Sequence, residues 1–457
     1  MEPPYDTSQQ SIEDNALVSW PRVAAVSAMV SFSIPTFMTG IELFSLLSWQ
    51  QTAITLLIGG ALLTLVGGLM GSIGAITRKN SYMLVKVAFG EQGARILNLL
   101  FAISLVGWFG LNLDLFSSSV AAILNYDDPS NTLTIGIEAI VGILMILTTM
   151  YGFNVINRLS IILVPVMVVV SAVLLYQSLN VTSFHHFTTA MNHAHGSISQ
   201  GVSLIVGVII IGAIILPDIT RFSRQRRGGA YTAFWSYLIA QSAVIVIAGF
   251  AAFALKANNI LDVLLALGIG SWSLLIVIAG SWILNALNLY SAELAVNASL
   301  PRLKQNLVAI GLGVVGMFSA FANILEIFVL FLSVLTAVFI PVAGIIAVDF
   351  FVLNKNGYFA SVSHKRESCT PSTSMQLSDE ALAPAQSPSI VQSPLFFNHK
   401  SALIAWAVGA GIAGYDLFEP LSLISGIAAL DAIVVSAILH LVVCSASRLF
   451  TDRRAQQ

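Results

Sequence analysis

Long apolar stretches recur along the chain from Val23 almost to the C-terminus, with short polar segments between them. A transmembrane helix needs about 20 consecutive, mostly apolar residues to cross the hydrocarbon core of a bilayer. The pattern predicts twelve such spans, at residues 23–47, 52–77, 96–124, 131–152, 159–178, 199–217, 231–255, 271–297, 306–323, 327–353, 401–415 and 421–447. We therefore expect an all-α integral membrane protein, embedded in a lipid bilayer.

Composition agrees with this interpretation, and the charges orient the chain. Hydrophobic residues make up 57% of the sequence and charged residues 9%, against roughly 45–50% and about 25% in a soluble domain. Of the 20 Lys and Arg residues, 19 fall in the loops and tails of one side, and only Lys256 falls on the other. Because cytoplasmic loops collect basic residues, the tails at 1–22 and 448–457 are both predicted to be cytoplasmic.

The plasma membrane is the expected location, and the compact length favours a bacterial inner membrane. The basic residues are dispersed along the chain and form no patch, so nucleic acid is not an expected partner. The one long polar insert, residues 354–400, is rich in Ser and Pro and is predicted to be a disordered cytoplasmic loop.

The sequence lacks the motifs of most enzyme classes. There is no phosphate-binding G-x-x-x-x-G-K-[ST] loop and no Cys–His, Ser–His–Asp or metal-ligand cluster within the spans. Four histidines, His185, His186, His193 and His195, share the exported loop before the sixth span, but no Cys or acidic residue lies at ligand spacing. We expect no enzyme activity, no cofactor and no metal centre, and transport without ATP hydrolysis.

Two spans carry helix-breaking residues inside an apolar run. The first contains residues 33–40, which end in Thr39 and Gly40, and the sixth contains Gly207, Gly212 and Pro217. They stand five spans apart and so have opposite orientations, which is typical of an inverted repeat. Interrupted helices in corresponding positions predict a binding site near the membrane midplane, although Gly and Pro are also common in ordinary transmembrane helices.

This arrangement divides the chain into a transport core, residues 23–353, and two additional spans within 401–447. In the core, spans one to five would correspond to spans six to ten. Thr39, Gly40 and Gly207 are accordingly candidates for the substrate site.

Acidic side chains inside the spans are the candidates for coupling, because a charge near the bilayer centre costs about 2.5–3.5 kcal/mol. Glu42 directly follows the break expected at Thr39 and Gly40, where it could exchange a proton. Asp218 precedes Arg221 by three residues, as in a helical ion pair. The full set is Glu42, Asp114, Glu138, Asp218, Glu293, Glu326, Asp349 and Asp431, most of them expected to be structural or interfacial.

Aromatic and amide side chains inside the spans suggest how a flat ligand is bound. Trp108 lies well inside the third span between Gly107 and Phe109, and Asn112 follows one turn later on the same face. In the eighth span, Asn285 and Asn288 also share a face. A planar heterocycle could stack on Trp108 and hydrogen-bond to these amides, although amides also join helices to each other.

At these positions the sequence resembles the nucleobase:cation symporter-1 family, and within it the bacterial cytosine permeases. The matching motifs are residues 39–40, 88–90, 106–110, 217–222, 282–290 and 349–351. The resemblance implies a LeuT-like fold of five plus five helices with two extra helices, and alternating access. It also implies a ring held between Trp108 and a sixth-span residue, here Ile209 where an aromatic side chain is common.

The resemblance also bears on the coupling ion. Sodium-dependent members carry two adjacent hydroxyl residues in the eighth span, and Ile283 and Leu284 occupy those positions here. Hydrocarbon cannot replace hard oxygen ligands, so we expect H⁺ rather than Na⁺ as the coupling ion. Glu42 is the first candidate for the proton carrier and Glu293 the second.

The leading hypothesis from the sequence is thus a proton-coupled symporter that imports a nucleobase such as cytosine or a purine. Hydantoin, allantoin and pyrimidine precursors are alternative substrates. A sodium-coupled amino-acid carrier on the same fold is the alternative within transporters. From a different class, a membrane sensor could retain a transporter fold and use the 354–400 loop for signalling.

Overall fold

The computed structural model is built of helices throughout its described residues, apart from an isolated backbone bridge between Val18 and Ser223. It describes residues 17–124, 132–151, 153–191, 195–257, 263, 271–300, 302–322, 324–359, 399–415 and 424–455. His193, most of the predicted 354–400 loop and part of both predicted tails lie outside these residues.

The helices follow the predicted spans in order. The first half of the chain forms α1 (Trp20–Ser31), α2 (Ile34–Leu46), α3 (Trp49–Thr77), α4 (Ser81–Ile123), α5 (Thr132–Met150), α6 (Phe153–Val181) and α7 (Phe184–Ala190). The middle forms α8 (Ile198–Ile214), α9 (Pro217–Thr220), α10 (Gly228–Ala233), the π-helix η2 (Phe234–Gln241) and α11 (Ser242–Leu255). The remainder forms α13 (Ser271–Ser299), α14 (Gln305–Phe321), η3 (Ile324–Ile327), α15 (Phe328–Val348), η4 (Asp349–Leu353), η5 (Lys355–Tyr358), α17 (His399–Tyr415) and α18 (Ala428–Ala455).

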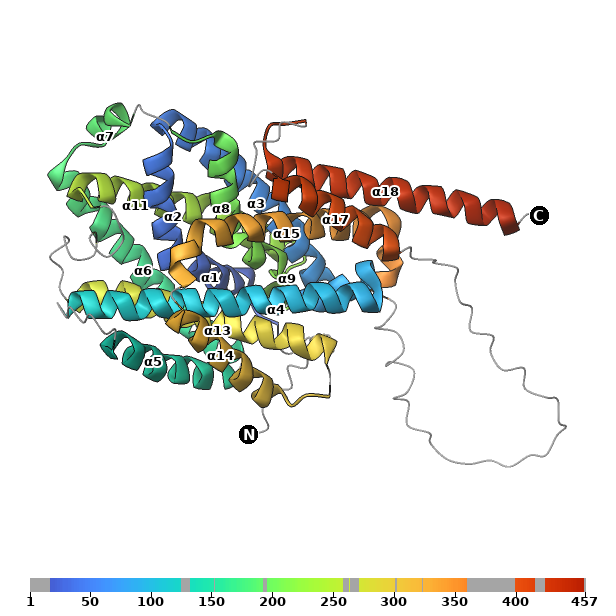
Figure 1. Ribbon diagram of the computed structural model, residues 1–457, viewed down its shortest axis with the longest axis horizontal. Coiled ribbons are helices and arrows are strands. Elements are labelled where there is room, and N and C mark those ends of the chain that lie inside the picture. The colour runs from blue at the N-terminus through green and yellow to red at the C-terminus, as the bar shows by residue number, and fades with distance from the viewer. Residues whose placement is uncertain are drawn as a thin grey trace.

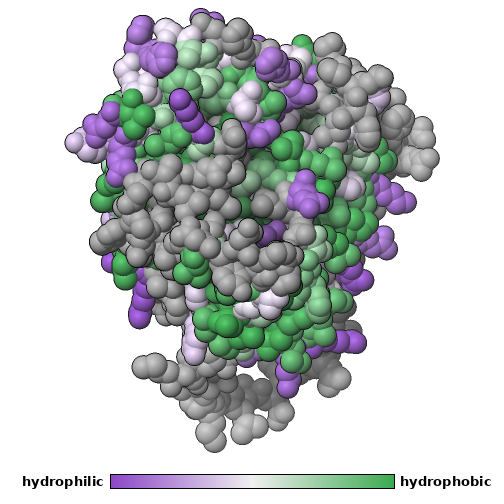
Figure 2. Space-filling view, turned by 60° about the vertical axis from the view of Figure 1, so that its left-hand side comes forward, coloured by the Kyte–Doolittle hydropathy of each residue, from purple (hydrophilic) through white to green (hydrophobic). Residues whose placement is uncertain are grey.

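The protein is a multi-pass membrane protein. Among the described residues, eight helices are long and apolar enough to cross a membrane, or nine if a bent pair forms one span. Each predicted span overlaps a helix or consecutive helices, and the number twelve stays a prediction. Many large apolar side chains are exposed, and Figure 2 shows broad hydrophobic areas on the described surface. In a bilayer these side chains face lipid.

The helices pack into a core bundle with a helical pair beside it. In Figure 1, α4 runs beside α13, and α17 and α18 lie together at one end of the bundle. The pair packs against α15, while α3 packs against α8 and α2 against α11. Most buried hydrophobic side chains belong to one continuous cluster that spans these helices.

The first interrupted helix breaks earlier than the sequence suggested. The chain leaves the helix at Phe32 and Ser33, and α1 and α2 meet at a 53° bend. Pro35 explains the position, because proline lacks an N–H and is best accommodated in the first turn of a helix. The break predicted at Thr39 and Gly40 is therefore wrong, since both residues lie inside α2.

The second interruption falls between α8 and α9. Helix α8 continues past Gly207 and Gly212 and ends at Ile214, and Pro217 begins the short helix α9. Gly207 serves close packing instead of a break, because a Cβ there would collide with the backbone of Leu332 in α15. Of the three predicted breakers in this span, only Pro217 marks the break.

A further helix precedes the predicted third span. Residues 81–89 are helical and continue into the rest of α4 across a kink at Gly90, where φ is 69°. Glycine adopts this left-handed conformation without the steric cost that a Cβ would add. The segment that the sequence predicted to be a loop between the second and third spans is thus largely helical.

Candidate functional site

A cavity of about 40 Å³ lies where the two helix breaks meet α4 and α13. Its walls come from Ser27, Val30 and Ser33 at the first break, Leu105 and Trp108 of α4, Val208, Ile211, Gly212, Ile215, Asp218 and Ile219 around the second break, Tyr237, and Leu284, Leu287, Asn288 and Ser291 of α13. An apolar cavity of about 150 Å³ holds a benzene ring. The walls must therefore move apart before a heterocycle can enter.

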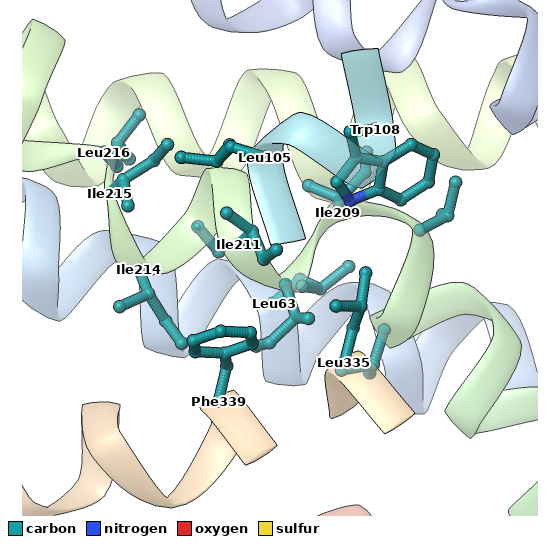
Figure 3. Packing of buried hydrophobic residues seen from close by; sticks show 14 of the residues in the cluster. Leu63, Leu105, Trp108, Ile209, Ile211, Ile214, Ile215, Leu216, Leu335 and Phe339 are labelled. Carbon is teal, nitrogen blue, oxygen red and sulfur yellow. The ribbon is translucent and has the colours of Figure 1, made fainter. Parts of the chain in front are cut away.

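Trp108 supplies the largest flat surface on this cavity. Its side chain is 5% exposed, and its ring packs against Phe331 of α15 in a T-shaped arrangement, with ring centroids 5.3 Å apart. Figure 3 shows the indole above α8, in the same packed group as Leu105 and Ile211, which also line the cavity. The indole face and the aliphatic walls together suit a flat, partly apolar ring.

Asn288 brings a polar group to the same cavity. The residue is 7% exposed, and its amide nitrogen Nδ2 has no hydrogen-bond partner among the described residues. A buried donor without a partner costs about 1–3 kcal/mol. This amide is therefore available to hydrogen-bond a ligand or water held in the cavity.

At the first break, hydrogen bonds from nearby residues satisfy the backbone carbonyl that the interruption exposes. The oxygen of Val30 accepts hydrogen bonds from Ser33 Oγ at 2.7 Å and from Thr36 Oγ1 at 3.2 Å, besides the Ser33 N–H at 3.3 Å. Facing this break, Leu284 lines the cavity, and the neighbouring Ile283 is buried. The break thus presents hydroxyl-capped backbone opposite hydrocarbon side chains.

The second break places a carboxylate on the cavity. Asp218 Oδ1 accepts hydrogen bonds from the backbone N–H of Ser81, at 2.9 Å, and from the Ser81 hydroxyl. Its other oxygen, Oδ2, has no hydrogen-bond partner in the described part of the chain, and the residue is 2% exposed. Arg221 Nε donates to the backbone oxygen of Asp218, at 3.2 Å.

Buried hydrogen bonds lie on one side of the cavity, next to Asp218. The Tyr82 hydroxyl donates to the backbone oxygen of Ser291 at 2.6 Å, and Arg221 Nη2 donates to the Tyr290 hydroxyl at 3.2 Å. Arg78 in turn donates to the backbone oxygen of Arg221, at 3.2 Å. These bonds tie the start of α4 and the second break to α13, on the side that the charges predict to be cytoplasmic.

The match to known sequences covers most of this architecture. A family model described as a permease for cytosine/purines, uracil, thiamine and allantoin matches residues 20–368. The chain belongs to the nucleobase:cation symporter-1 family. The cytosine permeases of Escherichia coli strain K12 and of strain O157:H7 are each 26% identical over 330 residues, which cover 72% of this chain and 77% of the relative. Members of this family are transporters, and so this protein is a transporter and not an enzyme.

Solved structures agree with the family at the level of the fold. A closed form of Mhp1, a nucleobase-cation-symport-1 family transporter with bromovinylhydantoin bound, superimposes with a TM-score of 0.71 and 17% identity, covering 95% of this chain and 93% of Mhp1. A Na⁺-coupled sialic acid symporter in a substrate-bound outward-open state gives 0.64 at 14% identity, covering 94% and 90% of the two chains. Identities this low establish the shared fold alone.

Among the residues predicted for a symporter-1 substrate site, Trp108 and Asn288 line the cavity, but Asn112 and Asn285 do not. Asn112 Nδ2 donates to the backbone oxygen of Trp108 at 2.7 Å. Asn285 Nδ2 donates to the backbone oxygen of Phe109 at 2.9 Å. These two amides thus stabilise α4 and its contact with α13.

The remaining predicted substrate residues do not line the cavity, and their part in substrate binding stays a prediction. Thr39 donates its hydroxyl to the backbone oxygen of Pro35 at 2.8 Å, and a Cβ on Gly40 would lie 2.5 Å from the backbone oxygen of Ile245. Gly207 packs against α15, as described above. Ile209 is 2% exposed and appears near the indole of Trp108 in Figure 3, but it does not line the cavity.

The two predicted proton carriers lie away from the cavity. Glu42 lines a separate cavity of about 280 Å³ together with Gln200 and Thr336, and Glu293 is buried in α13. The carboxylate that does line the cavity, Asp218, was interpreted from the sequence as a helical ion pair with Arg221. Its position one residue after the helix-breaking Pro217 was the signal that could have placed it at the site.

Proposed function

We propose that this protein imports a nucleobase or a related small heterocycle by alternating access, coupled to protons. The observation that carries the proposal is that Trp108 and Asn288 face one cavity between two interrupted helices. A stacking surface and a buried amide at that place suit a flat ring with polar edges. Movement of the cavity walls would expose the ring to one side of the membrane and then to the other.

Cytosine or a purine is the first substrate we propose, because the cavity offers both a donor and an acceptor. Asn288 Nδ2 can donate to a ring nitrogen or carbonyl, and Asp218 Oδ2 can accept from an N–H group. Cytosine and the purines present such groups side by side. Hydantoin, allantoin and pyrimidine precursors carry similar edges and are the alternative substrates.

Protons are the coupling ion we propose, and three observations support this. The Val30 carbonyl already accepts bonds from Ser33 and Thr36, and the side chains of Ile283 and Leu284 carry no oxygen atoms. In addition, Asp218 brings a titratable carboxylate to the cavity. We place Asp218 ahead of Glu42 and Glu293 as the proton carrier, because only a group near the substrate can bind its proton and the substrate cooperatively through direct contact.

We further propose that both termini are cytoplasmic, in a bacterial inner membrane, with residues 354–400 as a cytoplasmic loop. In this orientation the network around Tyr82 and Arg221 closes the cavity toward the cytoplasm. Release of the substrate would require these hydrogen bonds to separate.

The test is uptake of labelled cytosine into cells or vesicles that contain the protein. Adenine, hypoxanthine, uracil, allantoin, hydantoin and leucine compete in turn, and the sodium and proton gradients are varied separately. We expect one class of ring to compete and the proton gradient to drive uptake. Competition by leucine with a sodium requirement would favour the amino-acid carrier instead.

The sensor hypothesis has its own test in the same assay. Deletion of the loop between residues 360 and 398 should leave the uptake rate unchanged if the protein is a transporter. A protein that takes up none of the rings, and loses a signalling output when the loop is deleted, would be a sensor.

A further inference from the structure

A second cavity, of about 300 Å³, lies beside the first turns of α4 and the end of α13. It is separate from the substrate cavity, although Tyr82, which lines it, belongs to the network that closes that cavity. Three basic residues, Lys79, Lys86 and Arg95, line it together with one acidic residue, Glu91. The charges predict that this side of the protein faces the cytoplasm.

The single carboxylate is already paired with two of the three cations. Glu91 Oε2 lies 2.6 Å from Lys86 Nζ, and Glu91 Oε1 lies 3.5 Å from Arg95 Nη2. The side chains of these three residues are at least half exposed. These three residues form the outer part of the cavity. Because three basic residues and one acidic residue line it, the lining has an excess of positive charge.

Lys79 differs from the other two cations because it is buried. It is 3% exposed, and its ammonium group has no hydrogen bond or ion pair with any residue that the structure describes. Burial lowers the pKa of Lys79, since an ammonium group loses hydration there. A buried charge is expected to have a partner. The general excess of basic residues in cytoplasmic loops explains why several Lys and Arg residues lie on this side of the protein. It does not explain why one of them is buried beside a cavity.

Two neutral groups complete the inner lining. Asn98 is 2% exposed, and its Oδ1, which can only accept, has no hydrogen-bond partner among the described residues. The part-buried Ser299 has a hydroxyl that is likewise without a partner there. With the ammonium group of Lys79, the Ser299 hydroxyl offers donors of the kind that bind phosphate oxygens.

An exposed apolar strip begins beside the cavity. Ile96, Leu99 and Ile103 of α4 are 49%, 56% and 60% exposed, and their spacing of three and four residues places them on one face of the helix. Acyl chains of a lipid would lie along this strip while its headgroup reached Arg95 and Lys79.

We propose that this cavity binds a phosphate group, and that the group belongs to an anionic phospholipid of the cytoplasmic leaflet. Lys79 meets the phosphate from inside the cavity, and Lys86 and Arg95 hold it at the mouth. Basic pockets at the cytoplasmic ends of transmembrane helices bind such headgroups. The site lies where α4 and α13 meet the closing network, so occupancy stabilises the closed cytoplasmic side.

The test measures the melting temperature of the full-length protein purified in detergent, with added phosphatidylglycerol, phosphatidylcholine or inorganic phosphate. We expect phosphatidylglycerol to raise the melting temperature and the other two to have little effect. Lys79→Gln should raise the phosphatidylglycerol concentration that gives half of the full shift in melting temperature about tenfold. This is more than the roughly five-fold effect expected for one surface cation. Lys304→Gln, an exposed lysine on the same predicted side, is the matched control and should respond as the parent protein does.

Lys86→Gln and Arg95→Gln keep the test valid if Lys79→Gln fails to fold, because their side chains are 55% and 62% exposed. Each should raise the half-maximal phosphatidylglycerol concentration about five-fold. Equal responses in the parent and in all three variants would overturn the proposal. A full effect from inorganic phosphate, with none added by lipid, would overturn the lipid source and identify a site for free phosphate.

Discussion

The two interrupted helices differ in how they satisfy the groups that the interruption exposes. At the first break, Ser33 and Thr36 donate hydroxyl hydrogen bonds to the carbonyl of Val30, and the residues that line the cavity there are uncharged. At the second break, the chain continues directly into Asp218 and Arg221, two buried residues with ionisable side chains. In the proposed mechanism, the residue that couples proton and substrate binding therefore lies at the second break. The first break lines the cavity and bends between α1 and α2.

The largest expected effect comes from removing the carboxylate at the second break. Asp218→Asn keeps an oxygen that can accept from Ser81 but cannot carry a proton. We expect accumulation of cytosine against a gradient to be lost, while exchange of internal for external substrate continues, because exchange needs no net proton movement. Uptake and counterflow in the same vesicles separate the two.

Glu42→Gln and Glu293→Gln are the matched controls for this variant. Both should retain accumulation if coupling belongs to the second break. Lost accumulation in Glu42→Gln, with normal accumulation in Asp218→Asn, would move the proton carrier out of the cavity and contradict the comparison.

Removing the aromatic wall that faces both breaks should have the next largest effect. Stacking of a base on an aromatic side chain contributes about 1–3 kcal/mol, so Trp108→Ala should weaken substrate binding by roughly 5- to 150-fold. Equilibrium binding of labelled cytosine to purified protein measures this. Trp108→Phe should recover part of the affinity, and a Trp108→Ala variant that binds normally would place the substrate elsewhere.

The lack of side-chain oxygen atoms opposite the first break can be reversed by design. A double variant, Ile283→Ser with Leu284→Thr, restores two hydroxyls opposite the break. We expect sodium to lower the apparent KM of this variant about five-fold, the low end of typical coupling between ligands, and to leave the parent protein unaffected. Sodium-driven uptake in the parent would show that its first break already binds sodium through other oxygen atoms.

The smallest effect concerns the hydroxyl cap itself. Ser33→Ala removes one of the bonds to Val30, and a typical intramolecular hydrogen bond contributes about 0.5–1.5 kcal/mol. We expect the protein to unfold slightly more easily in a thermal or denaturant assay, with unchanged ion dependence. A change in coupling ion in this variant would mean that the cap controls ion binding.

The order and approximate extent of the helices could be predicted from hydrophobicity, because a bilayer requires long apolar stretches. The helix at residues 81–89 was missed, since this apolar segment is too short to cross a membrane and lies among basic residues. The exact break in the first span was also misplaced. Glycine lacks a side chain whether it serves a break or a close helix contact, and Gly40 serves the contact with Ile245.

The site could be predicted only in part. Trp108 and Asn288 were among the candidates, and helical spacing grouped Asn288 with Asn285 on one side of α13. Spacing does not reveal which amide meets a neighbouring backbone, and Asn285 does so at Phe109. Asp218 was assigned to a local ion pair because its bond to Ser81 joins residues far apart in the sequence.

The central claim is that the cavity between the breaks is the substrate site, and the most direct measurement compares two asparagines of α13. Asn288 lines the cavity, whereas Asn297, 8% exposed on the same helix, does not. Equilibrium binding of labelled cytosine should weaken about tenfold in Asn288→Ala, as expected when a buried hydrogen bond to a ligand is lost, and should be unchanged in Asn297→Ala. Equal affinities in Asn288→Ala and the parent protein would contradict the account.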